Sequence, residues 1–280
     1  MEIICKIRRS WDNINFSQQE DLIVKEYLLD KNKGIDFLNQ EISPILNSRE
    51  FEVKFASVFT HQKPLITRID DSHGGNKRCE LGDLLVVFSF MDRNGQPILN
   101  RAFISQAKKR RSIDNKCQKY LYDCDLGFRM PKNIYSKSKT CQDPKRFWPK
   151  YFCHRAKSLK YILLLSPTNV FVINTPWDLQ IGLCWELCLY FFILGYDGLR
   201  FSRKPYRTCG WSSIVWDLVS IVAQEITGKK KYGAIPRGNH ISLIVNYFNK
   251  FRNYENYRIE YEGEGIPTLF IFIKDNEILL

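Results

Sequence analysis

The chain has 280 residues, of which 44% are hydrophobic and 14% aromatic, ample material for the packed core of one large or two modest domains. We therefore expect a folded, soluble protein. The longest apolar run, residues 181–196, contains Glu186 and is shorter than the ~20 apolar residues that a transmembrane helix needs, so no membrane partner is expected. The N-terminus carries charges and no apolar signal segment, which argues against secretion.

Nine cysteines are scattered along the chain without a regular framework. This odd number, with no signal segment, favours reduced thiols in a cytoplasmic location rather than disulfides. Four of the cysteines and His154 fall between residues 117 and 154. Structural zinc sites usually include one closely spaced pair such as Cys-x-x-Cys, which this chain lacks, so zinc is not expected.

The N-terminal part is predicted to form helices and then the first strand. Apolar residues recur at helical spacing from Ser17 to a break at residues 31–34, and a second helix over residues 35–43 is ended by Pro44. Residues 51–59 are expected to form a strand. The loop after it contains Asp70 and Asp71, which we do not favour as ligands because no strand fixes them.

The most informative stretch is residues 79–111, CELGDLLVVFSFMDRNGQPILNRAFISQAKKRR. It predicts two apolar strands, residues 84–90 and 102–108, joined through the turn signal DRNG into a hairpin. Because side chains alternate along a strand, Gln106 and Lys108 should project to the same side. Asp83 immediately precedes the first strand. An acid, an amide and an amine are therefore expected to converge at one edge of a sheet.

This combination suits phosphodiester hydrolysis. The Asp83 carboxylate is a hard oxygen ligand for Mg²⁺, and a metal with open positions can hold a phosphate and a water together. The side-chain carbonyl of Gln106 can supply a further oxygen. Lys108 can orient or deprotonate the water and offset the charge that builds in the transition state.

The pattern Gly82-Asp83, a strand, a turn and then Gln106-x-Lys108 resembles the PD-(D/E)XK nuclease superfamily, which has the restriction-endonuclease-like fold. It looks most like the branches in which glutamine replaces the acid two residues before the lysine, as in Mrr-like restriction enzymes. The resemblance implies that Asp83 and Gln106 bind Mg²⁺ or Mn²⁺ and that Lys108 serves the attacking water. It also implies that a glutamate from the preceding helix completes the site.

The sequence leaves open which glutamate completes the site. Glu41, on the second predicted helix, is the first candidate, and a solvent-facing side chain is an equal interpretation of this residue. Glu20 and Glu50 are lesser candidates. Glu80, three residues before Asp83, is a further candidate metal ligand.

The basic excess is concentrated in residues 101–160, which hold 17 Lys or Arg against four acids, while the rest of the chain is close to neutral. Basic side chains neutralise phosphates and release counterions, so we expect a nucleic acid, DNA in the first place, to bind here. Aromatic residues interleaved with the basic ones fit core packing better than base stacking. The residues predicted to contact nucleic acid are Lys109, Arg110, Arg111, Lys145 and Arg146.

We expect an α/β fold in which a restriction-endonuclease-like central mixed sheet is flanked by helices and followed by a helical C-terminal half. Residues 1–175 would form the nuclease core, with N-terminal helices and a basic insertion at 109–160. Residues 176–280 would form a mainly helical extension packed on it. The expected later elements are strands at 161–165 and 170–173, helices at 178–194, 211–226 and 241–251, and a closing strand at 268–273.

The predicted function is a metal-dependent nuclease that hydrolyses phosphodiester bonds in DNA. By resemblance, such bacterial nucleases serve restriction, phage defence or repair, and they often require a protein partner. The main alternative is a catalytically inactive nucleic-acid-binding subunit on the same fold, because Gln106 replaces an acid. A helical interaction protein ranks last, since it leaves the basic residues unexplained.

Overall fold

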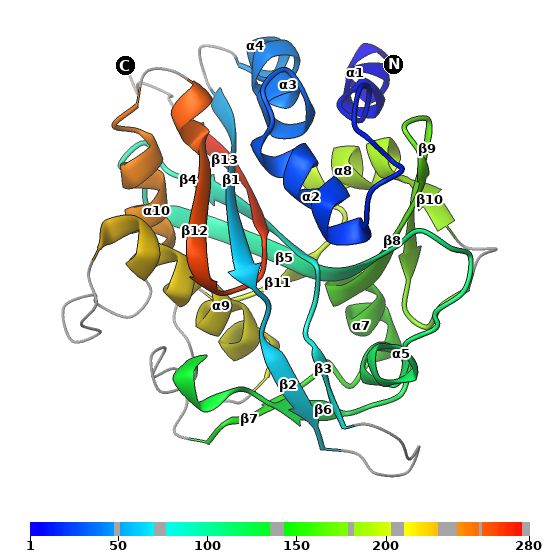
Figure 1. Ribbon diagram of the computed structural model, residues 1–280. Coiled ribbons are helices and arrows are strands. Elements are labelled where there is room, and N and C mark those ends of the chain that lie inside the picture. The colour runs from blue at the N-terminus through cyan, green and yellow to red at the C-terminus, as the bar shows by residue number, and fades with distance from the viewer. Residues whose placement is uncertain are drawn as a thin grey trace.

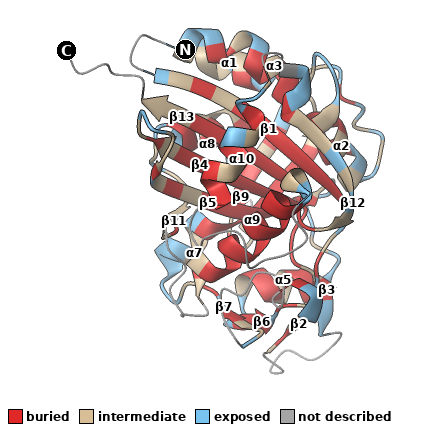
Figure 2. Ribbon diagram, turned by 90° about the vertical axis from the view of Figure 1, so that its left-hand side faces the viewer, coloured by how far each residue is buried: buried red, intermediate tan, exposed pale blue. Residues whose placement is uncertain are grey.

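The computed structural model arranges the chain in three layers, with a large mixed sheet between two layers that contain the helices (Figure 1, Figure 2). The expected α/β class, a large mixed sheet flanked by helices, is therefore confirmed. None of the helices within the described residues has the length and apolar character needed to span a bilayer. The described residues are 1–47, 51–69, 77–134, 143–178, 182–202, 210–228, 240–251 and 254–275.

The large sheet has nine strands among the described residues, in the order β10-β9-β8-β5-β4-β13-β1-β12, with β11 paired to β5. Neighbours are parallel at β5–β8, β4–β13 and β1–β12, and antiparallel at the other junctions. Their bounds are β1 (Phe51–Gln62), β4 (Leu84–Met91), β5 (Pro97–Lys108), β8 (Leu159–Ser166), β9 (Asn169–Asn174), β10 (Gly182–Cys184), β11 (Leu199–Arg200), β12 (Arg258–Glu264) and β13 (Thr268–Asp275).

The predicted hairpin is confirmed by the pairing of β4 with β5, which sets Leu84 opposite Ser105. In the turn, the backbone N–H of Gly95 donates to the carbonyl of Asp92, and Gly95 has a φ of +72°. Glycine adopts this left-handed conformation without steric cost, which is why the DRNG signal predicted the turn correctly.

Two hydrophobic cores cover the two faces of the large sheet, because successive side chains of a strand point to opposite faces. Val86 and Phe88 belong to one core, whereas Leu85 and Val87 belong to the other. Figure 1 shows the N-terminal helices on one side of the sheet and α9 with a second, smaller sheet on the other. The first core involves α1 (Glu2–Arg9), α2 (Glu20–Leu29), α3 (Gly34–Glu41), α4 (Ser43–Leu46) and α8 (Trp185–Ile193), and the second α5 (Lys116–Asp123), α9 (Trp211–Thr227), α10 (His240–Phe248) and the 3₁₀ turn η3 (Tyr254–Tyr257).

The small sheet has the order β3-β2-β6-β7, formed by β2 (Leu65–Arg68), β3 (Arg78–Glu80), β6 (Gly127–Arg129) and β7 (Lys145–Phe147). Strands β2 and β3 precede Asp83 in the chain, whereas β6 and β7 lie in residues 109–160, the region expected to be a basic insertion. That region also contains α5 and α7 (Phe152–Ser158), and it leads from β5 into the parallel strand β8. Its described part is thus an integrated element of the fold that completes a sheet begun by residues 65–80.

The expected division at residue 175 does not separate two structural units. Strand β13 lies in the middle of the large sheet, between β4 and β1, and β12 forms its edge beside β1. Leu269, Phe270 and Ile271 are fully buried, as expected for a strand covered on both faces. The C-terminal part therefore contributes strands to the core sheet in addition to helices.

Two predicted helices have different bounds in the structure. Pro44 does not simply end a helix; it occupies the first turn of the short helix α4, where the missing N–H of proline costs no hydrogen bond. The helix expected over residues 178–194 begins at Trp185, because Gly182–Cys184 pairs with β9 as strand β10.

Two buried ion pairs attach the small sheet to its surroundings. Arg146 of β7 donates from Nε to Asp217 of α9 over 2.5 Å, and both side chains are fully buried. Arg68 of β2 pairs with Asp125, which follows α5, and its Nη2 lies 2.9 Å from Asp125 Oδ1. A buried guanidinium without its carboxylate would be an uncompensated charge. Removing either member of a pair is therefore expected to destabilise the fold.

We predict that Asp217→Ala lowers the free energy of unfolding by about 3–5 kcal/mol, because it leaves the buried Arg146 guanidinium without its counter-ion. Urea unfolding followed by circular dichroism measures this change. The matched control is Asp114→Ala, which removes an exposed carboxylate 3.8 Å from Arg110 and should change the midpoint little. Equal stability of the two variants would contradict the structural role of the buried pair.

Candidate active site

The candidate site lies where two strands of the large sheet continue into the small sheet. Lys63 follows β1 and precedes β2, while Asp83 follows β3 and precedes β4. The two connections run side by side, since the backbone N–H of Leu81 donates to the carbonyl of Pro64 over 3.0 Å. At Gly82, a Cβ atom would lie 2.5 Å from a methyl group of Ile104. The chain can approach β5 this closely only because residue 82 is glycine.

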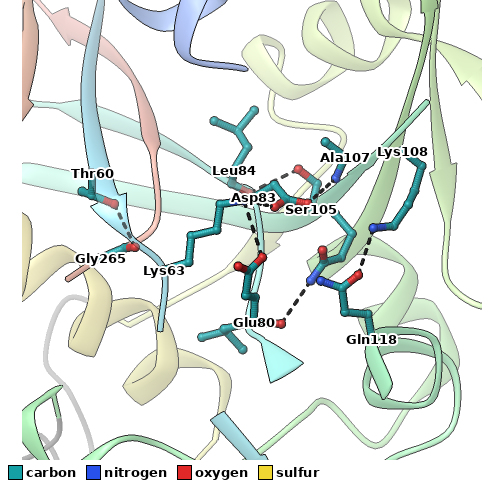
Figure 3. A network of polar contacts seen from close by, with 12 residues as sticks. Thr60, Lys63, Glu80, Asp83, Leu84, Ser105, Ala107, Lys108, Gln118 and Gly265 are labelled. Atoms are coloured by element: carbon teal, nitrogen blue, oxygen red, sulfur yellow. Dashed lines mark hydrogen bonds and ion pairs between the residues drawn. The ribbon is translucent and has the colours of Figure 1, made fainter. Parts of the chain in front are cut away.

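Asp83 connects three segments through its carboxylate and backbone (Figure 3). Its Oδ1 accepts a hydrogen bond from Nζ of Lys63 at 2.5 Å, and its Oδ2 accepts from the backbone N–H of Ala107 at 2.7 Å. Its own N–H donates to the carbonyl of Ser105 at 2.8 Å. Asp83 is only 5% exposed, and these contacts hold it beside the part of β5 that carries Gln106 and Lys108.

Lys63 is a member of the site that sequence reasoning missed. Its ammonium lies between two carboxylates, 2.5 Å from Oδ1 of Asp83 and 3.5 Å from Oε2 of Glu80. Burial alone would lower the pKa of Lys63, but the Asp83 carboxylate raises it above its ordinary value. Lys63 therefore stays charged at neutral pH. A lysine before a proline at a strand end carries no signal by which the sequence could have assigned it this position.

Gln106 is fully buried and only partly satisfied in its hydrogen bonding. Its Nε2 donates to the backbone carbonyl of Glu80 at 3.2 Å, whereas its Oε1 has no hydrogen-bond partner among the described residues. An unsatisfied buried oxygen is costly and is often the mark of a ligand site. Gln106 thus brings a free acceptor next to the strand that carries Glu80.

The side-chain oxygens of Asp83, Glu80 and Gln106 are suitable ligands for a hard divalent cation, although only the two carboxylates are negatively charged. Asp83 and Glu80 already surround one cation, the Lys63 ammonium, and Oε1 of Gln106 adds a free oxygen of the kind that Mg²⁺ takes. In the part of the chain that the structure describes, no three His, Cys, Asp or Glu side chains are grouped to hold a metal ion. Any metal here would rely on two carboxylates and an amide, and Lys63 would have to move away.

Lys108 lies at the edge of a polar cleft. Its Nζ donates to Oε1 of Gln118 on α5 at 2.9 Å (Figure 3). Because Gln106 and Lys108 are two residues apart in β5, their side chains project to the same side of the strand, as predicted. The cleft has a volume of about 590 Å³ and lies between the N-terminal end of α2, the end of β5 and α5. Among the residues that line it are Glu20, Lys108, Lys109, Arg110 and Gln118.

The structure favours a different helix acid from the one expected first. Glu41 lies at the end of α3 and pairs with Nζ of Lys6 at 2.7 Å, so it is engaged with α1 and not with Asp83. Glu20, a lesser candidate in the sequence, begins α2 and lines the cleft, where its Oε1 accepts the backbone N–H of Lys109 at 3.2 Å. Glu50 lies outside the described residues.

The predicted nucleic-acid contacts divide into exposed and structural residues. Arg110 and Arg111 are exposed at the end of β5, and Lys145 is half-buried. Lys109 uses its Nζ to bind the carbonyls of residues 17 and 18, the latter at 2.6 Å. Arg146 was wrongly assigned as a DNA contact, because its side chain is fully buried in the ion pair with Asp217. A residue with no exposed surface cannot reach a phosphate.

We predict that Lys63 and Asp83 are coupled in stability. Asp83→Asn and Lys63→Met should each lower the free energy of unfolding by about 1–3 kcal/mol, because each leaves a partly buried charge without its partner. In a double-mutant cycle measured by chemical denaturation, the loss in free energy of unfolding of the double variant should be smaller than the sum of the two single losses by about 1–2 kcal/mol. Strictly additive losses would show that the ion pair does not form in solution.

Comparisons with known proteins add no information about this site. A scan against protein-family models, a search of curated proteins and a search of solved structures all find no match. The fold and the geometry around Asp83 are therefore the observations from which a function has to be inferred.

Proposed function

We propose that this protein is a metal-dependent nuclease that hydrolyses phosphodiester bonds in DNA. The observation that carries the proposal is the placement of Asp83 against β5, where its carboxylate holds the backbone of Ala107, the residue between Gln106 and Lys108. This brings the acid and the Gln-x-Lys motif to one site on adjacent strands, as the resemblance to the PD-(D/E)XK nucleases implies. A polar cleft opens beside Lys108 and can admit a substrate.

In this proposal Asp83, Glu80 and Gln106 hold Mg²⁺ or Mn²⁺, and Glu20 of α2 lines the neighbouring cleft beside Lys108. When bound, the metal neutralises phosphate charge and makes water a better nucleophile. Lys108 orients the attacking water and offsets the negative charge of the transition state. Gln118 accepts a hydrogen bond from Lys108 and thereby holds its ammonium at the cleft edge.

In this proposal the Lys63 ammonium must move away from Asp83 before a metal can bind. Its ammonium is the counter-ion of Asp83, so a divalent cation competes with it for the same carboxylate. Lys63 remains charged at neutral pH because the Asp83 carboxylate raises its pKa, so deprotonation does not free the site. Once displaced, the flexible side chain of Lys63 is long enough to contact a substrate phosphate instead.

A second candidate function is a catalytically inactive nucleic-acid-binding subunit, and one specific observation favours it. The site has an internal cation in Lys63 and a neutral glutamine in place of an acid, a combination that a protein without need of a metal can retain. Such a subunit would bind DNA equally well with and without a chelator. A role in bacterial restriction, phage defence or repair, in the cytoplasm and with a protein partner, is compatible with either function.

The test is cleavage of single-stranded and double-stranded DNA with Mg²⁺ or Mn²⁺. We expect Asp83→Asn and Lys108→Met to lower the rate by about 10²–10³-fold or more, the usual cost of removing a group that stabilises the transition state. The matched control is Lys116→Met, an exposed lysine of α5, which should cleave like the natural protein.

Full activity of both Asp83→Asn and Lys108→Met would overturn the assigned site. Absence of cleavage, combined with DNA binding that a chelator does not change, would select the binding subunit. Circular dichroism of each variant separates a catalytic loss from a loss of fold.

A further inference from the structure

A second concave surface lies away from the Asp83 site and has no role in the proposed hydrolysis. This groove has a volume of about 660 Å³ and is formed by β5, β11, the start of α9, and the chain from β7 into α7. These elements lie together in Figure 2. Arg101, on β5, is five residues before Gln106, so the groove lies roughly 17 Å along the strand from the candidate site. We refer to it as the β11 groove.

The β11 groove is strongly basic. Four cationic side chains line it, and no Asp or Glu is among its described lining residues. His154 adds a group that can become positive. The cationic residues are Arg101, Lys150, Lys157 and Arg200.

Arg101 and Arg200 form a like-charge pair in the lining of the groove. They lie directly opposite each other in the antiparallel pairing of β5 with β11. Like charges in this position are unfavourable. Burial and the positive charge of Arg200 both lower the pKa of Arg101. The Asp197 carboxylate offsets part of the charge of Arg101, but it lies 3.0 Å from Nζ of Lys160 and is shared with that residue.

The guanidinium of Arg101 is held partly from within the fold. It donates from Nη1 to the carbonyl of Gly198 at 3.0 Å, while its Nε and the indole N–H of Trp148 are buried and have no hydrogen-bond partner among the described residues. Because these two atoms have no exposed surface, an anion in the groove would be bound by the exposed part of Arg101 and by the other cationic side chains of the lining.

Exposed aromatic side chains accompany these charges. Phe147 lines the groove and is 42% exposed, and Tyr151 and Phe152, at the start of α7, are 72% and 66% exposed. A duplex has its bases stacked internally and offers no faces to such rings. Positive charge combined with exposed rings is the arrangement by which proteins hold unpaired strands.

We propose that the β11 groove binds a single-stranded nucleic acid, with phosphates on Arg101 and Arg200 and bases against Phe147. The binding is a function of its own and does not require hydrolysis at Asp83.

The test is fluorescence anisotropy with a labelled 12-nucleotide oligothymidine and a labelled 12-base-pair duplex, in EDTA so that no metal-dependent cleavage occurs. We expect Arg200→Glu to weaken single-strand binding about tenfold or more and to lower its salt dependence. Arg8→Glu makes the same charge change at an exposed arginine of α1 and should weaken binding by less than about twofold. Phe147→Ala should weaken single-strand binding and leave duplex binding unchanged.

Equal losses in Arg200→Glu and Arg8→Glu would overturn the proposal, as would failure of the natural protein to bind the oligothymidine. Duplex binding as tight as single-strand binding would overturn it in favour of a backbone contact. Because this binding is measured in EDTA and cleavage is measured with Mg²⁺ or Mn²⁺, failure of the nuclease proposal and failure of this one give different results.

Discussion

The ion pair between Lys63 and Asp83 holds together the part of the molecule on which the candidate chemistry depends. It joins the connection that leads from β1 of the large sheet to β2 of the small sheet with the connection that leads back from β3 to β4, and the other Asp83 oxygen binds the backbone of β5. Gly82 allows these connections to approach β5 closely. The acid, the Gln-x-Lys motif and the junction of the two sheets are therefore positioned by one contact. The same contact gives Asp83 a counter-ion, so the stability that this ion pair contributes would oppose the proposed metal binding at this residue.

The Lys and Arg side chains of this basic protein serve two physical purposes. Some of its residues are internal to the fold: Arg146 is buried against Asp217, and Lys160 pairs with Asp197. These charges carry no information about a ligand, because their partners are part of the chain. Arg101 and Arg200 face each other in a groove whose described lining contains no Asp or Glu, and for such residues an external anion is the simplest compensation. Net charge alone cannot separate the two groups, since only burial and partners distinguish them.

Local patterns predicted local structure well. The hairpin of β4 and β5 followed from alternating apolar residues and the DRNG turn, and the common side of Gln106 and Lys108 followed from strand geometry. Long-range pairing was not predictable: nothing near residue 268 indicates that β13 inserts between β4 and β1. For the same reason Lys63 was missed and Glu41 was preferred to Glu20, since contacts over 20 or more residues depend on the packed fold.

The most direct measurement is titration with Mn²⁺, followed by electron paramagnetic resonance, of the natural protein and of the Lys63→Met, Asp83→Asn and Lys63→Met/Asp83→Asn variants. If Asp83 is a metal ligand and Lys63 its competitor, Lys63→Met should bind one Mn²⁺ at least about tenfold more tightly than the natural protein, because a positive charge has been removed from the site. Both variants that lack the Asp83 carboxylate should lose this site. Failure of Lys63→Met to bind Mn²⁺, or unchanged binding in Asp83→Asn, would contradict a metal centre at Asp83.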